Sequence, residues 1–217
     1  MTETDPVAFI RANTVVAAPP LVPELRLHLA TEVTPLWEAT EATLRQNNLP
    51  PPYWAFAWPG GQAVARHVLD HPELVAGKRV LDFAAGTGLV AIAAALRGAT
   101  CVAAEIDRFA VAAIELNAAL NGVAVETVSE DLIGHALPDI DVVLAGDVCY
   151  ERPMAERATT WMRLLAARGA TVILGDPGRA YLPRQGLEAL GRHTVPTSLD
   201  LEDRETRETT VWRLLPS

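Results

Sequence analysis

Two acidic residues flank a glycine-rich turn near the middle of this 217-residue chain. Asp82 lies in an apolar run that leads into Ala84, Gly86 and Gly88, and Glu105 ends the next apolar run. Glycines in such a turn allow backbone angles and a close ligand approach that a Cβ atom would prevent. Glu105 follows Gly86 by about 20 residues, the spacing at which an acid meets the hydroxyl groups of a bound ribose. The pattern therefore predicts a site for a ligand that contains a nucleoside.

The charge of Asp82 distinguishes between two such ligands. The spacing Gly86-x-Gly88-x-x-Ala91 fits a dinucleotide fingerprint, so NAD is one candidate. A pyrophosphate binds to backbone N–H groups at a helix N-terminus, and the carboxylate of Asp82 would repel it. The same carboxylate would attract the ammonium group of S-adenosylmethionine, which carries a sulfonium and no phosphate. We therefore predict S-adenosylmethionine as the cofactor, with a NAD-binding oxidoreductase or a non-catalytic binding module as the alternative.

Large aromatic side chains precede a second turn, Pro59-Gly60-Gly61. One interpretation places Trp54 or Trp58 in the wall of the cofactor pocket, because aromatic faces attract ammonium and sulfonium groups by ~0.5 to 2 kcal/mol. In the other interpretation the aromatic residues pack beneath an N-terminal cap. The two tryptophans need not have the same role, so both interpretations remain open.

Further candidates follow later apolar runs. Asp131 is either an acceptor for the adenine amino group or an acid that caps its own loop. Asp147 and Tyr150 follow the fourth predicted strand, at the carboxyl edge where open α/β sheets place their chemistry, and are the candidates for the reaction itself. The sequence contains no CxxC or HExxH pattern, so we predict no metal site. The predicted cofactor site also includes the neighbouring positions Ile106, Leu132 and Gly146.

The elements that must position these residues alternate between apolar strands and amphipathic helices. We predict one α/β domain over residues 1–217, with a cap or lid over 1–60 and a core over 61–217. Its sheet is expected to be mostly parallel, with helices on both faces and a C-terminal antiparallel hairpin. The predicted helices are 5–13, 34–46, 62–69, 89–96, 109–121 and 154–168, and 25–29 is expected to be extended. The predicted core strands are 79–83, 100–104, 123–128, 141–146 and 170–174, followed by the pair 193–199 and 209–215.

Composition limits the possible partners. The net charge of −9 disfavours nucleic acid as the main partner, because neutralisation of phosphates drives that binding, and it would suit a basic protein. No apolar run reaches the ~18 to 20 residues of a membrane span, so no membrane association is expected. The acidic start of the chain does not resemble a signal peptide, and two cysteines form no disulfide framework. We therefore expect a cytoplasmic protein.

Four motifs occur together and in order, and together they resemble a known family. They are Tyr53-Trp54-Ala55 with Trp58-Pro59-Gly60-Gly61-Gln62, the run 82–88, Asp147-x-x-Tyr150, and Gly175-Asp176-Pro177-Gly178-Arg179. From about residue 25 to the C-terminus the chain is similar to the lysine methyltransferases that modify the β-subunit of electron transfer flavoprotein. The tryptophan motif and the Gly175–Arg179 motif are the most specific part of the resemblance. The sequence departs from the usual pattern at Ala84, where seven-stranded methyltransferases more often have glycine.

The resemblance implies a fold, a reaction and a partner. The fold would be a seven-stranded, Rossmann-like methyltransferase sheet, and the compact chain favours a bacterial, monomeric member. The reaction would be an in-line transfer from a sulfonium to a lysine ε-nitrogen, of which only about one in a thousand is neutral at pH 7.4. Asp147 would orient the amine and Tyr150 would pack or hydrogen-bond beside it; whether Asp147 or water takes the proton stays open. A ribosomal protein or a small amine remains an alternative acceptor.

Overall fold

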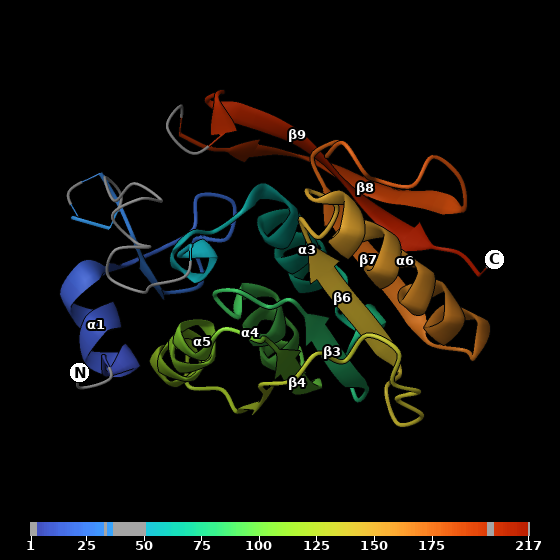
Figure 1. The fold of residues 1–217 in the computed structure, drawn as a ribbon, viewed down its shortest axis with the longest axis horizontal. Coiled ribbons are helices and arrows are strands. Elements are labelled where there is room, and N and C mark those ends of the chain that lie inside the picture. The colour runs from blue at the N-terminus through green and yellow to red at the C-terminus, as the bar shows by residue number, and fades with distance from the viewer. Residues whose placement is uncertain (1–3, 33, 37–50, 199–201, 217) are drawn as a thin grey trace.

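The computed structural model describes residues 4–32, 34–36, 51–198 and 202–216. Its centre is a seven-stranded sheet in the order β5-β4-β3-β6-β7-β9-β8 (Figure 1). The five strands β3 to β7 are parallel, and β9 pairs antiparallel with both β7 and β8. The strands are β3 (Arg79–Phe83), β4 (Thr100–Ala104), β5 (Val125–Val128), β6 (Val142–Gly146), β7 (Thr171–Asp176), β8 (Leu187–Pro196) and β9 (Thr206–Leu214).

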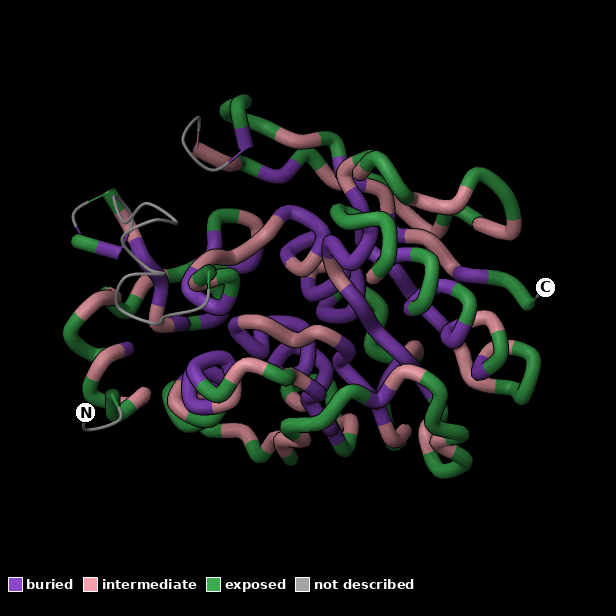
Figure 2. Tube along the Cα trace, viewed as in Figure 1, coloured by how far each residue is buried: buried purple, intermediate pink, exposed green. Residues whose placement is uncertain are grey.

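Helices cover both faces of the sheet, as the sequence predicts. The helices are α3 (Pro59–Asp70), α4 (Leu89–Leu96), α5 (Arg108–Leu120) and α6 (Arg152–Ala167). Alternate residues of each buried strand point to opposite faces. Val80 and Val142 therefore lie in the cluster with α3, α4 and α5, whereas Leu81 and Val143 lie in the cluster with α6. The strands at the centre of the sheet are buried along most of their length (Figure 2). No helix in the described part of the chain is long and apolar enough to cross a membrane.

The N-terminal region forms a small cap against α5. Helix α1 (Pro6–Asn13) begins where the sequence predicts, because the side chain of Asp5 accepts a hydrogen bond from the backbone N–H of Val7. The ring of Phe9 packs edge-on against that of Phe109 in α5, at a centroid distance of 5.3 Å. Strands β1 (Val15–Ala17) and β2 (Leu27–Leu29) pair antiparallel, and the predicted extended segment includes β2. Most of the helix predicted at 34–46 lies outside the described residues.

Several boundaries differ from the prediction by a few residues, and two of these differences have a local reason. Helix α3 begins at Pro59 and not at Gln62, because proline suits the first position of a helix, where no N–H donor is needed. Strand β8 begins at Leu187, six residues before the predicted 193. A register shift between Ala189 and Gly191 interrupts the alternation of side chains by which the strand would have been recognised.

Candidate active site

A cavity of about 710 Å³ lies at the carboxyl ends of β3, β4 and β6, within the range for small-molecule sites. The strand order reverses between β3 and β6, which is where open α/β sheets bind their ligands. Ten residues of the predicted site line this cavity: Trp54, Trp58, Ala84, Gly86, Glu105, Ile106, Asp131, Gly146, Asp147 and Tyr150. Asp82, Gly88 and Leu132 do not line it.

The turn after β3 has three residues in the left-handed region of backbone space. Ala84, Gly86 and Gly88 have φ angles of 55°, 52° and 76°. This conformation favours glycine, which explains why glycine is common where this chain has Ala84. Gly88 has a packing role, because a Cβ atom there would lie 3.1 Å from two side-chain carbons of Ile114.

Glu105 ends β4 with its carboxylate held beside this turn. Its Oε2 accepts the N–H of Gly86 at 3.1 Å, and its Oε1 accepts the N–H groups of Ile106 and Asp107 at 2.8 and 3.3 Å. A carboxylate has about four acceptor sites, so these three bonds fix its orientation and leave room for a ligand hydroxyl. Burial raises the pKa of Glu105, and the three backbone donors oppose that shift.

Asp82 lies beneath the cavity and not in its lining, so its predicted contact with the cofactor stays a prediction. Its side chain is only 1% exposed, and its Oδ2 accepts the N–H of Ala91 in the first turn of α4 at 2.9 Å. Burial raises its pKa to about 7. Asp82 therefore supports the start of α4 and does not itself line the cavity. Leu132 is likewise a buried core residue, and its neighbour Ile133 lines the cavity instead.

The two tryptophans have different surroundings. Trp54 is only 2% exposed and lies parallel to the ring of Phe109 at 6.3 Å, so it is mainly part of the cap core. Trp58 lies nearer the opening, and its indole N–H donates to the carbonyl of Tyr53 at 2.8 Å. Tyr53 also packs against Tyr150, with ring centroids 5.8 Å apart. Tyr53 and Tyr150 are 51% and 47% exposed, so together they form an aromatic mouth of the cavity.

Asp131 caps its own loop and lines the cavity, and its role as an acceptor for adenine stays a prediction. Its Oδ1 accepts the N–H of Ile133 at 3.0 Å, which is a local loop cap. Its Oδ2 pairs with Arg157 of α6 at 2.9 Å, and both side chains are at least half exposed. These contacts lower the pKa of Asp131, so it is ionised at neutral pH.

The first turn of α3 lies directly on the ends of β6 and β7. Gly146 and Gly175 are paired across these strands, and α3 approaches them with Gly60 and Gly61. A Cβ atom on Gly146 would lie 2.4 Å from the backbone nitrogen of Gly61, and one on Gly175 would lie 2.1 Å from the carbonyl oxygen of Gly60. Only glycine permits this approach at Gly60, Gly146 and Gly175, which gives one glycine of each of the two most specific motifs a shared physical cause.

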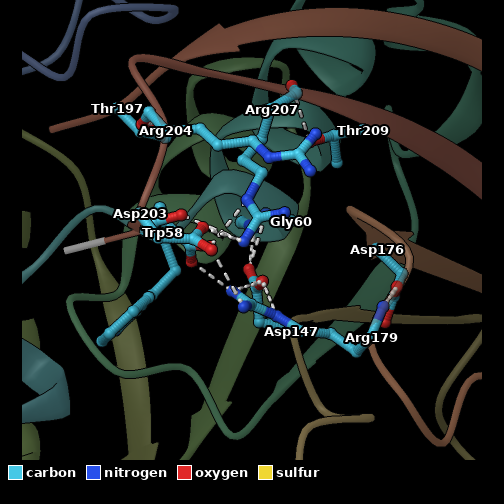
Figure 3. Close-up of polar contacts among 12 residues, drawn as sticks. Trp58, Gly60, Asp147, Asp176, Arg179, Thr197, Asp203, Arg204, Arg207 and Thr209 are labelled. Atoms are coloured by element: carbon cyan, nitrogen blue, oxygen red, sulfur yellow. Dashed lines mark hydrogen bonds and ion pairs between the residues drawn. The ribbon is translucent and has the colours of Figure 1, made fainter. Parts of the chain in front are cut away.

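Asp147 is clamped where these segments meet. Its Oδ2 accepts the N–H groups of Gly60 and Gly61 at 2.5 and 3.2 Å. Its Oδ1 accepts Nε and Nη2 of Arg179 at 3.1 and 2.7 Å (Figure 3). Its φ of 57° is left-handed, a strained conformation for a residue other than glycine. Burial raises its pKa to about 6, and the guanidinium of Arg179 opposes the shift.

Negatively charged groups predominate in the described lining of the cavity. Among the described residues, six carboxylates and two guanidinium groups line it. Arg157 and Arg179 are each paired with one of those carboxylates, Asp131 and Asp147. The excess of negative charge suits a ligand with a sulfonium and an ammonium, and opposes a pyrophosphate. The lining carboxylates are Glu105, Asp107, Glu130, Asp131, Asp147 and Glu151.

Sequence reasoning assigned no role to Tyr53 or Arg179. Arg179 is the last residue of the Gly175–Arg179 motif, so the motif drew attention to this position. The motif could not show the contact with Asp147, which lies 32 positions away in the sequence. Asp176 explains how the motif delivers it: the Oδ1 of Asp176 accepts the N–H groups of Gly178 and Arg179 at 2.7 and 2.6 Å. This local turn directs the arginine back across the end of β7.

Comparisons with known proteins show the family of this chain. Residues 67–173 match the family model "Ribosomal protein L11 methyltransferase (PrmA)". The chain is 37% identical to the electron transfer flavoprotein beta subunit lysine methyltransferase of Danio rerio, over 97% of this chain and 84% of that protein. It is 33% identical to the protein of the same name from Homo sapiens, over 96% of this chain and 82% of that one.

A solved structure supports the fold. Magnesium protoporphyrin IX methyltransferase from Synechocystis, crystallised with S-adenosylmethionine, superposes with a TM-score of 0.53 at 17% identity. The match covers 72% of this chain and 78% of that one. The family matches, all to methyltransferases, give S-adenosylmethionine as the cofactor. The chain belongs to the family of electron transfer flavoprotein β-subunit lysine methyltransferases, which are S-adenosylmethionine-dependent enzymes.

Proposed function

We propose that this protein methylates lysine on the β-subunit of an electron transfer flavoprotein. The relatives that carry this name align over more than four fifths of their length, and the aligned part includes the whole cavity. The observation that carries the proposal is the mouth of the cavity. It is walled by the half-exposed rings of Tyr53 and Tyr150 and leads to carboxylates, which suits a long, positively charged lysine side chain.

The cofactor contacts follow from the same geometry. Glu105 holds the ribose hydroxyls with its remaining acceptor capacity, and the left-handed turn at Ala84 and Gly86 lets the backbone approach the ligand. Trp58 lies beside the aromatic mouth, where its face can meet a cation. Asp82 supports this arrangement indirectly through α4.

The transfer itself needs a neutral amine aligned with the methyl group. The ε-nitrogen would form a bond to the methyl carbon while the carbon–sulfur bond breaks and its electron pair stays on sulfur. The methylated nitrogen is then positively charged until it loses one of its two protons. All four acceptor sites of Asp147 are already taken by protein donors. No acceptor site is left for the amine, so we assign Asp147 an electrostatic role, with water at the open mouth as the proton acceptor.

One chain supplies the whole described lining of the cavity, so we propose that the protein acts as a monomer. Light scattering of the purified protein across a concentration series measures this directly. A stable dimer whose partner covers the mouth would contradict the proposal.

Transfer of a labelled methyl group tests the substrate. The purified chain is incubated with labelled S-adenosylmethionine and, separately, with the flavoprotein β-subunit, ribosomal protein L11 and free lysine. We expect label on the β-subunit, at a lysine identified by mass spectrometry. L11 is the sharpest competitor, because the matching L11 model covers the cofactor-binding half but leaves residues 1–66, including Tyr53 and Trp58, unmatched. Label on L11 or free lysine alone, by a preparation that binds the cofactor, would refute the proposed substrate.

A further inference from the structure

A buried glutamate just before β9, Glu202, pairs with Arg179 in the wall of the active site. The side chain of Glu202 is 1% exposed and accepts hydrogen bonds from Arg179 through both carboxylate oxygens. Arg207 at the start of β9 donates its Nε to the Oε2 of Glu202 at 3.0 Å, and its Nη2 to the backbone carbonyl of Glu202 at 3.0 Å. Charges therefore alternate from Asp147 through Arg179 and Glu202 to Arg207.

This arrangement is not explained by the stability of the sheet. A buried ion pair costs about as much desolvation free energy as its attraction returns, so an apolar pair could fill the same space. Arg179 uses a planar group with fixed donor directions, and its Nη2 serves Asp147 and Glu202 together. The result is that Asp147, at the cavity wall, is held from one side by α3 and from the other by Arg179.

We propose that Arg179 is a positioning residue for methyl transfer and that Glu202 holds Arg179 in place, so that the C-terminal hairpin takes part in building the reaction centre. This inference rests on the proposed role of Asp147 in lysine methylation. Arg179 fixes the direction of the Asp147 carboxylate and balances its charge. An unbalanced carboxylate would stabilise the ammonium form of the incoming lysine, which is not nucleophilic.

The charges around Asp147 determine how the test is designed. Besides Arg179, the titratable groups near Asp147 are Asp176 at the end of β7, Glu202 on the far side of the guanidinium, and the neutral thiol of Cys149. Asp176 disfavours ionisation of Asp147, and Arg179 favours it. Removal of Arg179 therefore raises the pH at which Asp147 becomes ionised.

The pH dependence of kcat/KM separates a positioning role from a structural one. At saturating cofactor, log kcat/KM rises with a slope of one as the lysine, with a pKa of about 10.4, loses its proton. Below about pH 6 the protonation of Asp147 adds a second unit of slope in the wild-type enzyme. Arg179→Gln is expected to move this change of slope upward by at least ~1 pH unit. It is also expected to lower kcat at least ~10-fold at neutral pH, while the Kd of S-adenosylmethionine changes less than ~2-fold.

Two further variants keep the test decisive. Arg179→Lys retains the charge and loses the paired donors, so the change of slope stays near the wild-type pH and kcat is partly recovered. Glu202→Gln retains an acceptor for Arg179. This variant is expected to lower kcat ~3- to 10-fold without raising the pH at which the slope of log kcat/KM changes. Glu188→Gln is the matched control, because Glu188 forms an exposed pair with Arg213 on the same hairpin, and its activity should equal that of the wild type.

The outcomes are distinct. The acceptor in these assays is the flavoprotein β-subunit. If the wild-type enzyme does not methylate that subunit, the acceptor is the protein that it does label. A wrong substrate is therefore recognised before the variants are compared. Wild-type kcat and an unmoved change of slope in Arg179→Gln would overturn the inference. If Arg179→Gln does not fold, as shown by the loss of cofactor binding and of cooperative melting, Arg179→Lys decides. A Lys variant indistinguishable from Glu188→Gln would then overturn it.

Discussion

Replacement of Gly60 by alanine tests whether the close approach of α3 sets the position of Asp147. The added Cβ atom would lie 2.3 Å from the carbonyl oxygen of Gly175, 2.5 Å from Oδ2 of Asp147 and 2.6 Å from its backbone nitrogen. Two of these three atoms belong to the backbone of the β6 and β7 ends, which cannot move aside cheaply. The first turn of α3 must shift instead, and the hydrogen bond from Gly60 to Asp147 is lost or lengthened.

The size of the effect follows from these contacts. Overpacking costs ~1 to 3 kcal/mol, and a hydrogen bond to a charged group contributes ~1.5 to 3 kcal/mol. Alanine returns ~0.5 to 1 kcal/mol through its better helix propensity. The free energy of unfolding should therefore fall by ~2 to 5 kcal/mol, which for a chain of this size lowers Tm by ~4 to 20 °C.

Gly61→Ala is the control within the same turn. The nearest atom to its added Cβ is Cγ2 of Val90 at 4.0 Å, an ordinary contact distance. This variant should melt at the wild-type temperature or a few degrees above it, because it gains ~0.5 to 1 kcal/mol of helix propensity without a clash.

Thermal melting, cofactor calorimetry and methyl transfer on the same preparations complete the assay. Gly60 does not line the cavity, so Gly60→Ala should bind S-adenosylmethionine with an affinity within ~3-fold of wild type while turnover falls ~100-fold, the effect of misplacing a positioned group by about 1 Å. If Gly60→Ala melted and turned over like Gly61→Ala, the reasoning that α3 positions Asp147 would be wrong.

Three other predictions concern the cofactor turn and Asp147. Glu105→Ala should weaken S-adenosylmethionine binding ~30- to 150-fold in calorimetry, because charge-assisted hydrogen bonds to the ribose are lost; an unchanged Kd would move this contact to Asp107. Asp147→Asn should bind the cofactor almost normally yet lose at least ~100-fold in turnover, and it should also melt at lower temperature because its new NH₂ group faces donors of the clamp; normal turnover would remove Asp147 from the mechanism. Ala84→Gly should raise the free energy of unfolding by up to ~1 kcal/mol, because φ is 55° there, whereas Ala85→Gly, which has no positive φ, should lower it by ~0.5 to 1 kcal/mol in the same chemical denaturation series. Equal effects of the two glycine substitutions would contradict the strain assigned to Ala84.

Much of the cofactor half is determined by signals that are local in the sequence. Strand β3, the glycine turn, α4 and β4 follow one another within residues 79–104, and each is marked by apolar runs or glycines that the chain itself displays. Glu105 could be placed for the same reason, since an acid directly after a parallel strand must lie at the carboxyl edge. The left-handed φ angle at Ala84 agrees with the glycine that related methyltransferases more often have at this position.

The surroundings of each acid depended on how distant segments pack. Asp82 lies near the end of the apolar strand β3, and Glu105 directly follows the apolar strand β4. Asp82 nevertheless lies beneath α4, whereas Glu105 lines the cavity. Asp82 is buried because α4 crosses the sheet above it, and the residues around position 82 do not indicate where α4 crosses.

The reaction centre shows the same limit most clearly. Asp147 accepts donors from Gly60, 87 residues earlier, and from Arg179, 32 residues later. Arg179 in turn meets Glu202 across another 23 residues. Sequence by itself determined that Asp147 stands at a strand end with a glycine-rich helix start and an arginine motif elsewhere in the chain. Only the tertiary structure decided that these groups fill every acceptor site of its carboxylate, because hydrogen bonds form between atoms that folding brings within about 3 Å, whatever their separation along the chain.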